Sequence, residues 1–175
     1  KNVINVANLC VEAKDKIIGF DIAGPELSFP PSLFAESFKK VSESGVNITI
    51  HAGEGDGVSS IIDALNNGAM RIGHGVRIIE DINDGIIGPT ASKIIDLQIP
   101  LEICITSNIH TNMYESYEAH PISSLIDYGF NVYLNTDNRL MSNTSISKEV
   151  EIAKNLGISD VDRLLKYSAS DSFFD

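Results

Sequence analysis

The chain has 175 residues, of which 43% are hydrophobic, and its formal net charge at pH 7 is −11. This length and apolar content suffice for one domain with a buried core. The negative charge argues against a general nucleic-acid or anionic-membrane binder, which needs a basic face. No apolar run approaches the roughly 18 residues of a membrane helix.

Cysteine usage indicates a reducing compartment. Cys10 and Cys104 are far apart and form no CxxC pattern, so we expect two core thiols in a cytoplasmic protein. No secretory signal is visible, but the chain begins with Lys1 rather than Met, so this absence excludes little.

Strand-like and helix-like segments alternate along the chain. A lone helical segment is expected over 2–14. Apolar runs then predict strands over 17–22, 46–50, 69–72, 101–105 and 132–134. Helical spacing of apolar residues, with proline and glycine at several boundaries, predicts helices over 31–44, 57–67, 90–98, 121–128, 146–156 and 160–170.

The order of these segments predicts an α/β fold made of about five βα units. The strands are almost wholly apolar, as parallel strands covered on both faces should be. A complete TIM (β/α)₈ barrel has about 250 residues, or roughly 30 per unit, and this spacing fits. An open doubly wound sheet also fits the count, but no GxGxxG or GxxxxGK[ST] motif follows any strand. We therefore expect a partial TIM-type barrel.

Polar residues gather where the predicted strands end, which is where the active sites of TIM barrels lie. The strand ends read DIAGPE (21–26), HAGEGD (51–56), RIGHG (71–75), CITSN (104–108) and NTDN (135–138). His51 and Glu54 would point apart in a regular strand, so they can share a site only if the glycines around Glu54 let the backbone bend.

Each histidine also has an ordinary structural explanation. His51 alone would be a core histidine bonded to the backbone, and His74 between two glycines could mark a tight turn. His110 and His120 are expected to be surface or capping residues. The functional interpretation therefore depends on the set of strand-end residues rather than on any single one.

These motifs, in this order and at these strand ends, resemble adenosine deaminase of the metal-dependent hydrolase barrels. HAGE, GHG and the NTD element together are highly specific, and the resemblance extends over essentially the whole chain. It implies a zinc-dependent aminohydrolase that converts adenosine, a small-molecule purine nucleoside, to inosine and ammonia. It also implies that residues 1–175 are the C-terminal part of one barrel domain, containing barrel strands 4–8.

The resemblance assigns roles to the strand-end residues. His51 and Asp137 correspond to zinc ligands. Glu54 corresponds to the acid that protonates purine N1, and it must hold a proton, which an enclosed apolar pocket favours. His74 corresponds to the residue that orients the attacking hydroxide. Asp137 and the residue after it also have an ordinary explanation, because such residues often cap helices.

Two further residues correspond to substrate contacts. The backbone of Gly24 matches the donor near purine N3. Asn138 stands where many family members have a second aspartate that contacts N7, and this departure leaves the base specificity less certain. The amide of Asn138 can donate to N7 at any pH, whereas a carboxylate must be protonated to do so.

Half of the expected metal site has no counterpart in the sequence. The family draws two more zinc ligands from an HxH pair on its first strand, and no HxH occurs in these 175 residues. Catalytic zinc usually has three protein ligands, so we expect the complete parent protein to be the enzyme and this chain alone to be inactive. We also expect the chain to self-associate through the open edges of its first and last strands.

Three alternatives remain open. A related adenine or AMP deaminase would share most of these motifs. A non-catalytic binding module derived from the barrel would explain the missing HxH but not the retained Glu54, His74 and Asp137. A cytidine-type deaminase is disfavoured, because the HxE and PCxxC signatures are missing.

Overall fold

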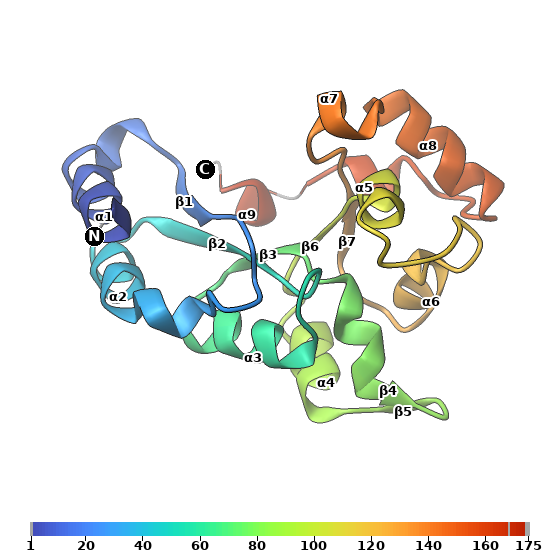
Figure 1. Ribbon diagram of the computed structural model, residues 1–175, viewed down its shortest axis with the longest axis horizontal. Helices are drawn as coiled ribbons and strands as arrows, with labels where there is room; N and C mark the ends of the chain where they lie inside the picture. The colour runs from blue at the N-terminus through green and yellow to red at the C-terminus, as the bar shows by residue number, and fades with distance from the viewer. Residues whose placement is uncertain (1, 168, 174–175) are drawn as a thin grey trace.

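The computed structural model describes residues 2–167 and 169–173, and within them the chain forms one parallel sheet of five strands (Figure 1). The strands are β1 (Gly19–Ile22), β2 (Asn47–Ala52), β3 (Arg71–His74), β6 (Leu101–Ile103) and β7 (Val132–Leu134). Each neighbouring pair is parallel, and the spatial order β1-β2-β3-β6-β7 follows the chain. A doubly wound sheet reverses its strand order at a switch point, so this sheet is a segment of a TIM-type barrel.

Helices connect consecutive strands, as the sequence predicts. The crossovers contain α2 (Ala35–Glu43), α3 (Val58–Asn66), α4 (Pro89–Asp96) and α6 (Ile122–Asp127). In Figure 1, α2, α3 and α4 lie along one face of the sheet. The chain opens with α1 (Asn2–Glu12), which packs on α2, and α8 (Ile146–Asn155) follows the last strand.

The core lies between the sheet and these helices. On β2, Ile48 and Ile50 are buried against the helical layer, while His51, the last strand residue but one, is only partly buried. Burial of each such large side chain contributes about 1.5–3 kcal/mol. Cys10 and Cys104 are both buried free thiols, as expected.

Several short elements were not predicted. They are η1 (Lys14–Lys16), η2 (Pro31–Phe34), η3 (Val76–Asp81), the hairpin β4 (Ile82–Asn83) and β5 (Ile86–Ile87), α5 (Ile105–His110) and α7 (Arg139–Ser142). The predicted strand 101–105 ends at Ile103, because α5 begins at Ile105. The carboxylate of Glu149 on α8 accepts a hydrogen bond from the Thr106 N–H at the start of α5, so the cap of this helix comes from a residue 43 positions away.

The predicted helix over 160–170 is wrong for the described residues, which contain only η4 (Arg163–Leu165) and α9 (Ala169–Ser172) there; residue 168 lies outside them. Tyr167 instead stacks on Tyr133 of β7 with ring centroids 3.9 Å apart, and its hydroxyl accepts a hydrogen bond from Asn135. These contacts with the sheet favour extended backbone before Tyr167, where Lys166 has φ −109° and ψ 91°.

A membrane-spanning helix must be both long, at about 20 residues, and apolar, and the helices of the described part of the chain can be judged by these two requirements. None of them meets both requirements.

Candidate active site

Three of the residues that the sequence singled out meet at the C-terminal ends of β2 and β3. His51 Nε2 lies 3.5 Å from Glu54 Oε2, and His74 Nδ1 lies 3.5 Å from Glu54 Oε1. The two imidazole rings meet edge to face with centroids 4.6 Å apart. One nitrogen or oxygen from each residue lies within 4.8 Å of the others, close enough for the three groups to hold one metal ion.

The backbone bend that brings Glu54 back to His51 occurs at Gly53. This glycine has φ +74°, and a Cβ at this position would lie 2.5 Å from Cδ1 of the fully buried Ile61. Gly55 does not adopt a left-handed conformation, and a Cβ there would be 3.8 Å from the Cβ of Glu26. The expected bend is therefore present, but it depends on the first glycine.

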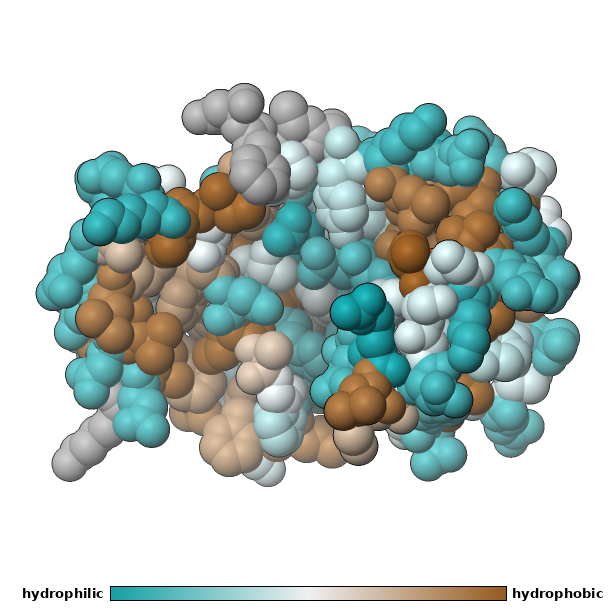
Figure 2. All heavy atoms as spheres, turned by 90° about the horizontal axis from the view of Figure 1, so that it is seen from above, coloured by the Kyte–Doolittle hydropathy of each residue, from teal (hydrophilic) through white to brown (hydrophobic). Residues whose placement is uncertain are grey.

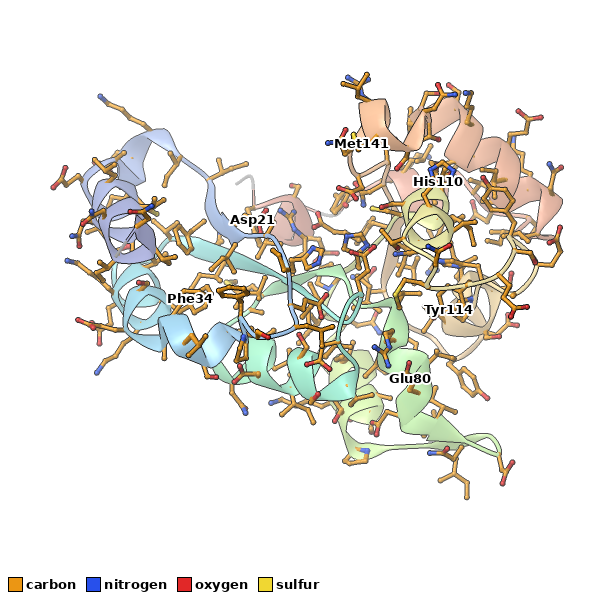
Figure 3. The ribbon with its side chains drawn as sticks, in the orientation of Figure 1. Asp21, Phe34, Glu80, His110, Tyr114 and Met141 are labelled. Carbon is orange, nitrogen blue, oxygen red and sulfur yellow. The ribbon has the colours of Figure 1, made fainter. Side chains whose placement is uncertain are left out.

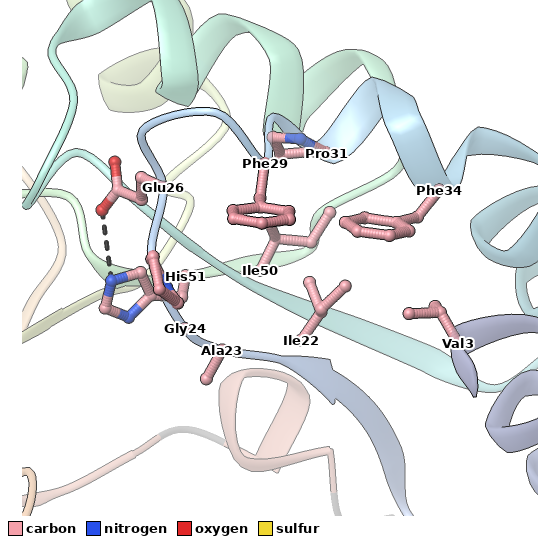
Figure 4. Close-up of a pocket in the computed structure, with 11 residues that line it drawn as sticks. Val3, Ile22, Ala23, Gly24, Glu26, Phe29, Pro31, Phe34, Ile50 and His51 are labelled. Carbon is pink, nitrogen blue, oxygen red and sulfur yellow. Dashed lines mark ion pairs between the residues drawn. The ribbon is translucent and has the colours of Figure 1, made fainter. Parts of the chain in front are cut away.

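Glu26, which sequence reasoning missed, holds this loop in place. Its carboxylate accepts hydrogen bonds from four consecutive backbone N–H groups, those of residues 53 to 56, at 2.8 to 3.1 Å. One of its oxygens also lies 3.2 Å from Nε2 of His51, and Figure 4 marks this pair with a dashed line. The only sequence signal was its position in DIAGPE at the end of a strand.

The charge of Glu26 is maintained by these partners. Burial raises the pKa of its carboxyl, but the hydrogen bond with His51 and those from the loop outweigh burial and hold the pKa at about 2. Burial lowers the pKa of His51, but Glu26, Glu54 and Asp137 together raise it above its usual value. The pKa of His74 is lowered, because its deeper burial prevails over the same carboxylates.

Asn108 joins Glu54 to His74 and was also missed. Its side chain is fully buried, and Nδ2 lies 3.0 Å from Glu54 Oε1 and 3.2 Å from His74 Nδ1. The amide oxygen lies 3.2 Å from Nε2 of His120. His120, expected to be a surface or capping residue, is therefore buried and connected to the site. His110, labelled in Figure 3, is exposed on α5, as expected.

Asp137 lies on the wall of the same site but outside the group of three. With His51 and His74 it lines a polar cavity of about 340 Å³. Its Oδ2 accepts a hydrogen bond of 2.7 Å from Ser107 Oγ. Both His74 (φ +61°) and Asp137 (φ +51°) have left-handed backbones; such strain in residues other than glycine persists where the surroundings enforce it and is common at functional sites.

The two residues expected to contact substrate line two different cavities. Gly24 lines a second cavity of about 310 Å³ together with Glu26 and His51. Figure 4 shows the apolar wall of this cavity, which includes Phe29 and Phe34. Asn138 caps α7, and its Oδ1 accepts a hydrogen bond from the Met141 N–H. That bond occupies the oxygen of the amide, whose Nδ2 group is a donor.

A comparison with protein families assigns the chain. The family model described as "Adenosine deaminase" matches residues 2–175. The chain belongs to the adenosine deaminase family. Among curated relatives, adenosine deaminase of Mycobacterium ulcerans is 43% identical over 152 residues, and adenosine deaminase 1 of Streptomyces coelicolor is 45% identical over 155 residues. These matches cover 83% and 85% of this chain but 42% and 39% of the relatives, so the chain spans about two fifths of their length.

Solved structures agree with the partial barrel. Adenine deaminase from Arthrobacter aurescens superimposes with a TM-score of 0.84 at 26% identity, covering 93% of this chain and 49% of that protein. The N6-methyl-AMP deaminase from Arabidopsis thaliana superimposes with a TM-score of 0.82 at 26% identity. This match covers 99% of this chain and 50% of that protein. An amidohydrolase from Burkhoderia ambifaria with bound zinc shares the fold, with a TM-score of 0.81 and 20% sequence identity. This match covers 93% of this chain and 46% of that protein.

The resemblance to adenosine deaminase and the partial TIM-type barrel expected from the sequence are both confirmed by these findings. The family is one of hydrolytic deaminases that act on small purine compounds.

Proposed function

We propose that the complete protein containing this chain is a zinc-dependent adenosine deaminase, which hydrolyses adenosine and deoxyadenosine to inosine or deoxyinosine and ammonia. The observation that carries this proposal is the convergence of His51, Glu54 and His74, of which His51 lines both an apolar and a polar cavity. The apolar cavity suits a flat purine ring, and the polar cavity suits water and a metal ion. The named activity of the curated relatives supports this substrate.

His51 and Asp137 are the proposed zinc ligands of this chain. Imidazole nitrogen and carboxylate oxygen are both ligands that zinc accepts, and the two residues line one cavity. In this proposal, two further histidines come from an HxH pair outside these 175 residues. When bound, zinc lowers the pKa of water to about 7 and so supplies a nucleophile at neutral pH.

Glu54 is the proposed proton donor to purine N1. Addition of the water oxygen to C6 places negative charge on the ring, and a proton at N1 neutralises it. Because Asn108 Nδ2 donates to Oε1 of Glu54, Oε2 is the oxygen that carries the proton. The hydroxyl group on C6 then passes its proton to the amino group, the C6–N6 bond breaks, and ammonia leaves while C6 keeps the oxygen as a carbonyl. The other proton of the water returns to the Glu54 carboxylate, so that each turnover consumes one water molecule and releases one ammonia. His74 orients the attacking oxygen.

Substrate contacts complete the proposal. The backbone N–H of Gly24 faces purine N3, and the Nδ2 group of Asn138 donates to N7. We also propose a cytoplasmic location and a role in purine nucleoside salvage.

A related substrate is the second candidate, because solved structures of an adenine deaminase and an N6-methyl-AMP deaminase share this fold. Among the described residues that line the two cavities, none is Lys or Arg. A nucleotide phosphate is normally bound by such cations, so this half of the site favours a neutral substrate. Turnover of adenosine, adenine and AMP by the same preparation distinguishes the candidates.

Substitution of Glu54 and His51 tests the assigned chemistry in the complete protein. Glu54→Gln keeps the size of the side chain but removes the proton donor, so turnover of adenosine should fall by about 10²- to 10⁴-fold or more with zinc content unchanged. His51→Ala should lower both zinc content and turnover, whereas His110→Gln should change neither, because the side chain of His110 is exposed at the end of α5. Full activity of Glu54→Gln would refute the role of this glutamate.

The 175-residue chain by itself provides a further comparison. It contains two of the proposed zinc ligands, so we expect weak zinc binding and no measurable change in ultraviolet absorbance from adenosine to inosine. Strong deaminase activity of this chain would show that the HxH pair is unnecessary or replaced.

A further inference from the structure

A buried path of hydrogen bonds leads from the active site to His120, beyond the residues assigned above. Asn108 Nδ2 contacts both Glu54 Oε1 and His74 Nδ1, and Asn108 Oδ1 contacts His120 Nε2 at 3.2 Å. Asn108 is fully buried and His120 is 4% exposed. The ring of Tyr114, labelled in Figure 3, packs edge to face on the imidazole of His120, with centroids 5.1 Å apart.

The backbone N–H of Ile122 fixes the direction of the hydrogen bonds along this path. The Ile122 N–H donates to Nδ1 of His120 at 3.2 Å. A backbone N–H can only donate, so Nδ1 of His120 must be an acceptor and carries no proton. Burial lowers the pKa of His120 to about 4, so the ring is neutral at pH 7 and its one proton is on Nε2.

This proton determines the orientation of the Asn108 amide. His120 Nε2–H donates to Oδ1 of Asn108, so the Nδ2 group points to the other side of the amide. Its two protons match two acceptors, Oε1 of Glu54 and Nδ1 of His74. Since Nδ1 of His74 accepts, a neutral His74 carries its proton on Nε2.

We propose that Asn108 and His120 are positioning residues that select the Nε2–H tautomer of His74 and orient the carboxyl group of Glu54 for the deamination proposed above. The effect on deamination rests on the proposed function, whereas the tautomer and the hydrogen-bond directions do not. Reversal of the amide would place Asn108 Oδ1 about 3.0 Å from a carboxyl oxygen of Glu54, where two acceptors would repel each other. His120 opposes this reversal because its Nε2–H needs an acceptor.

Two substitutions of His120 separate its two hydrogen bonds. The amide of Gln reaches as far as Nε2 of histidine, so His120→Gln keeps a donor to Asn108. The amide of Asn reaches only as far as Nδ1, so His120→Asn keeps the acceptor for Ile122 N–H and loses the donor. A merely structural role of His120 predicts similar effects of both substitutions.

Nitrogen-15 NMR of histidine-labelled protein at pH 7 reads the tautomers directly. We expect Nε2–H for His74 and His120 in the wild type, and Nε2–H for His74 in His120→Gln. Asn108→Asp replaces the amide donor by an acceptor, so His74 should change to the Nδ1–H tautomer. A wild-type His74 with its proton on Nδ1, or an unchanged tautomer in Asn108→Asp, would overturn the proposal.

Steady-state kinetics of the complete protein tests the catalytic part. We expect kcat for adenosine to fall about tenfold or more in His120→Asn and Asn108→Asp, with KM changed less, and to remain within about threefold of wild type in His120→Gln. Equal kcat values for His120→Asn and His120→Gln would overturn the positioning role. A wild-type protein with the expected tautomers but no adenosine turnover would overturn the proposed function alone and leave the hydrogen-bond assignment intact.

Discussion

At the scale of single residues, Glu26 connects the stability of the site loop to its geometry. One carboxylate accepts the N–H groups of residues 53 to 56 and also contacts His51. Without it, these loop amides would lose their acceptor, and His51 would lose the partner that raises its pKa most. The acidic side chain therefore both orders the loop and orients the imidazole.

The effect of Glu26 on stability should depend on pH. The pKa of its carboxyl is about 2 in the folded protein, whereas the reference value is 4.5. At pH 7 the ionised carboxyl therefore contributes up to about 3 kcal/mol to the free energy of unfolding. This contribution is fully present above pH 4.5 and is lost as the pH falls toward 2. We expect Glu26→Gln to destabilise the protein at pH 7 and much less at pH 3, measured by urea unfolding.

The matched control for this substitution is Glu43→Gln. Within the part of the chain that the structure describes, Glu43 forms an exposed i,i+4 ion pair with Lys39, and its side chain is 67% exposed. The stability change should therefore stay within about 0.5 kcal/mol. An equal loss of stability in Glu26→Gln at both pH values would contradict the ionised state assigned to this residue.

At the scale of elements, the β2–α3 loop depends on Gly53 and much less on Gly55. An alanine at Gly53 would combine φ +74° with a contact of 2.5 Å to Ile61 Cδ1. Ile61 is fully buried in α3 and has little room to move. We expect Gly53→Ala to lower the unfolding free energy by about 1–3 kcal/mol and to reduce deaminase activity, because the loop carries Glu54.

Gly55→Ala is the control within the same loop. Its added Cβ would make an ordinary contact of 3.8 Å, so the expected change is below about 1 kcal/mol. Thermal unfolding of the two variants in parallel measures this difference. A tolerated Gly53→Ala would mean that the loop can carry Glu54 in another backbone conformation.

At the scale of the whole molecule, the sheet has two edge strands, β1 and β7. Apolar side chains are exposed near the first edge: Leu27 is 64%, Phe29 55% and Leu33 62% exposed. Figure 2 shows brown, apolar surface over the end of the molecule that carries α1, α2 and β1 in Figure 1. Open edges and apolar patches tend to be covered by another chain.

We expect the 175-residue chain to self-associate through this surface or through an open edge. Sedimentation velocity should show association that increases with protein concentration. The double substitution Phe29→Ser and Leu33→Ser should weaken this association. Leu140→Ser removes an even more exposed apolar side chain, on α7, and should leave the association unchanged. A monomer at the highest concentration would contradict the expectation.

The alternation of strands and helices was predictable from the sequence, because apolar periodicity and turn residues act within a few positions of each other. The convergence of His51, Glu54 and His74 was predictable for a related reason. Parallel strands end at the same edge of a sheet, so residues at their ends must meet. The one bend required between His51 and Glu54 was marked locally by glycine.

Only the tertiary structure decided which residues support this group. Glu26 reaches its loop across 27 to 30 positions, Asn108 reaches Glu54 across 54, and Glu149 caps α5 across 43. His120 likewise reaches Asn108 across 12 positions, and Tyr167 stacks on Tyr133 of the last strand. A buried polar group must find a partner wherever the fold supplies one, and short-range sequence patterns carry no record of which distant residue that is.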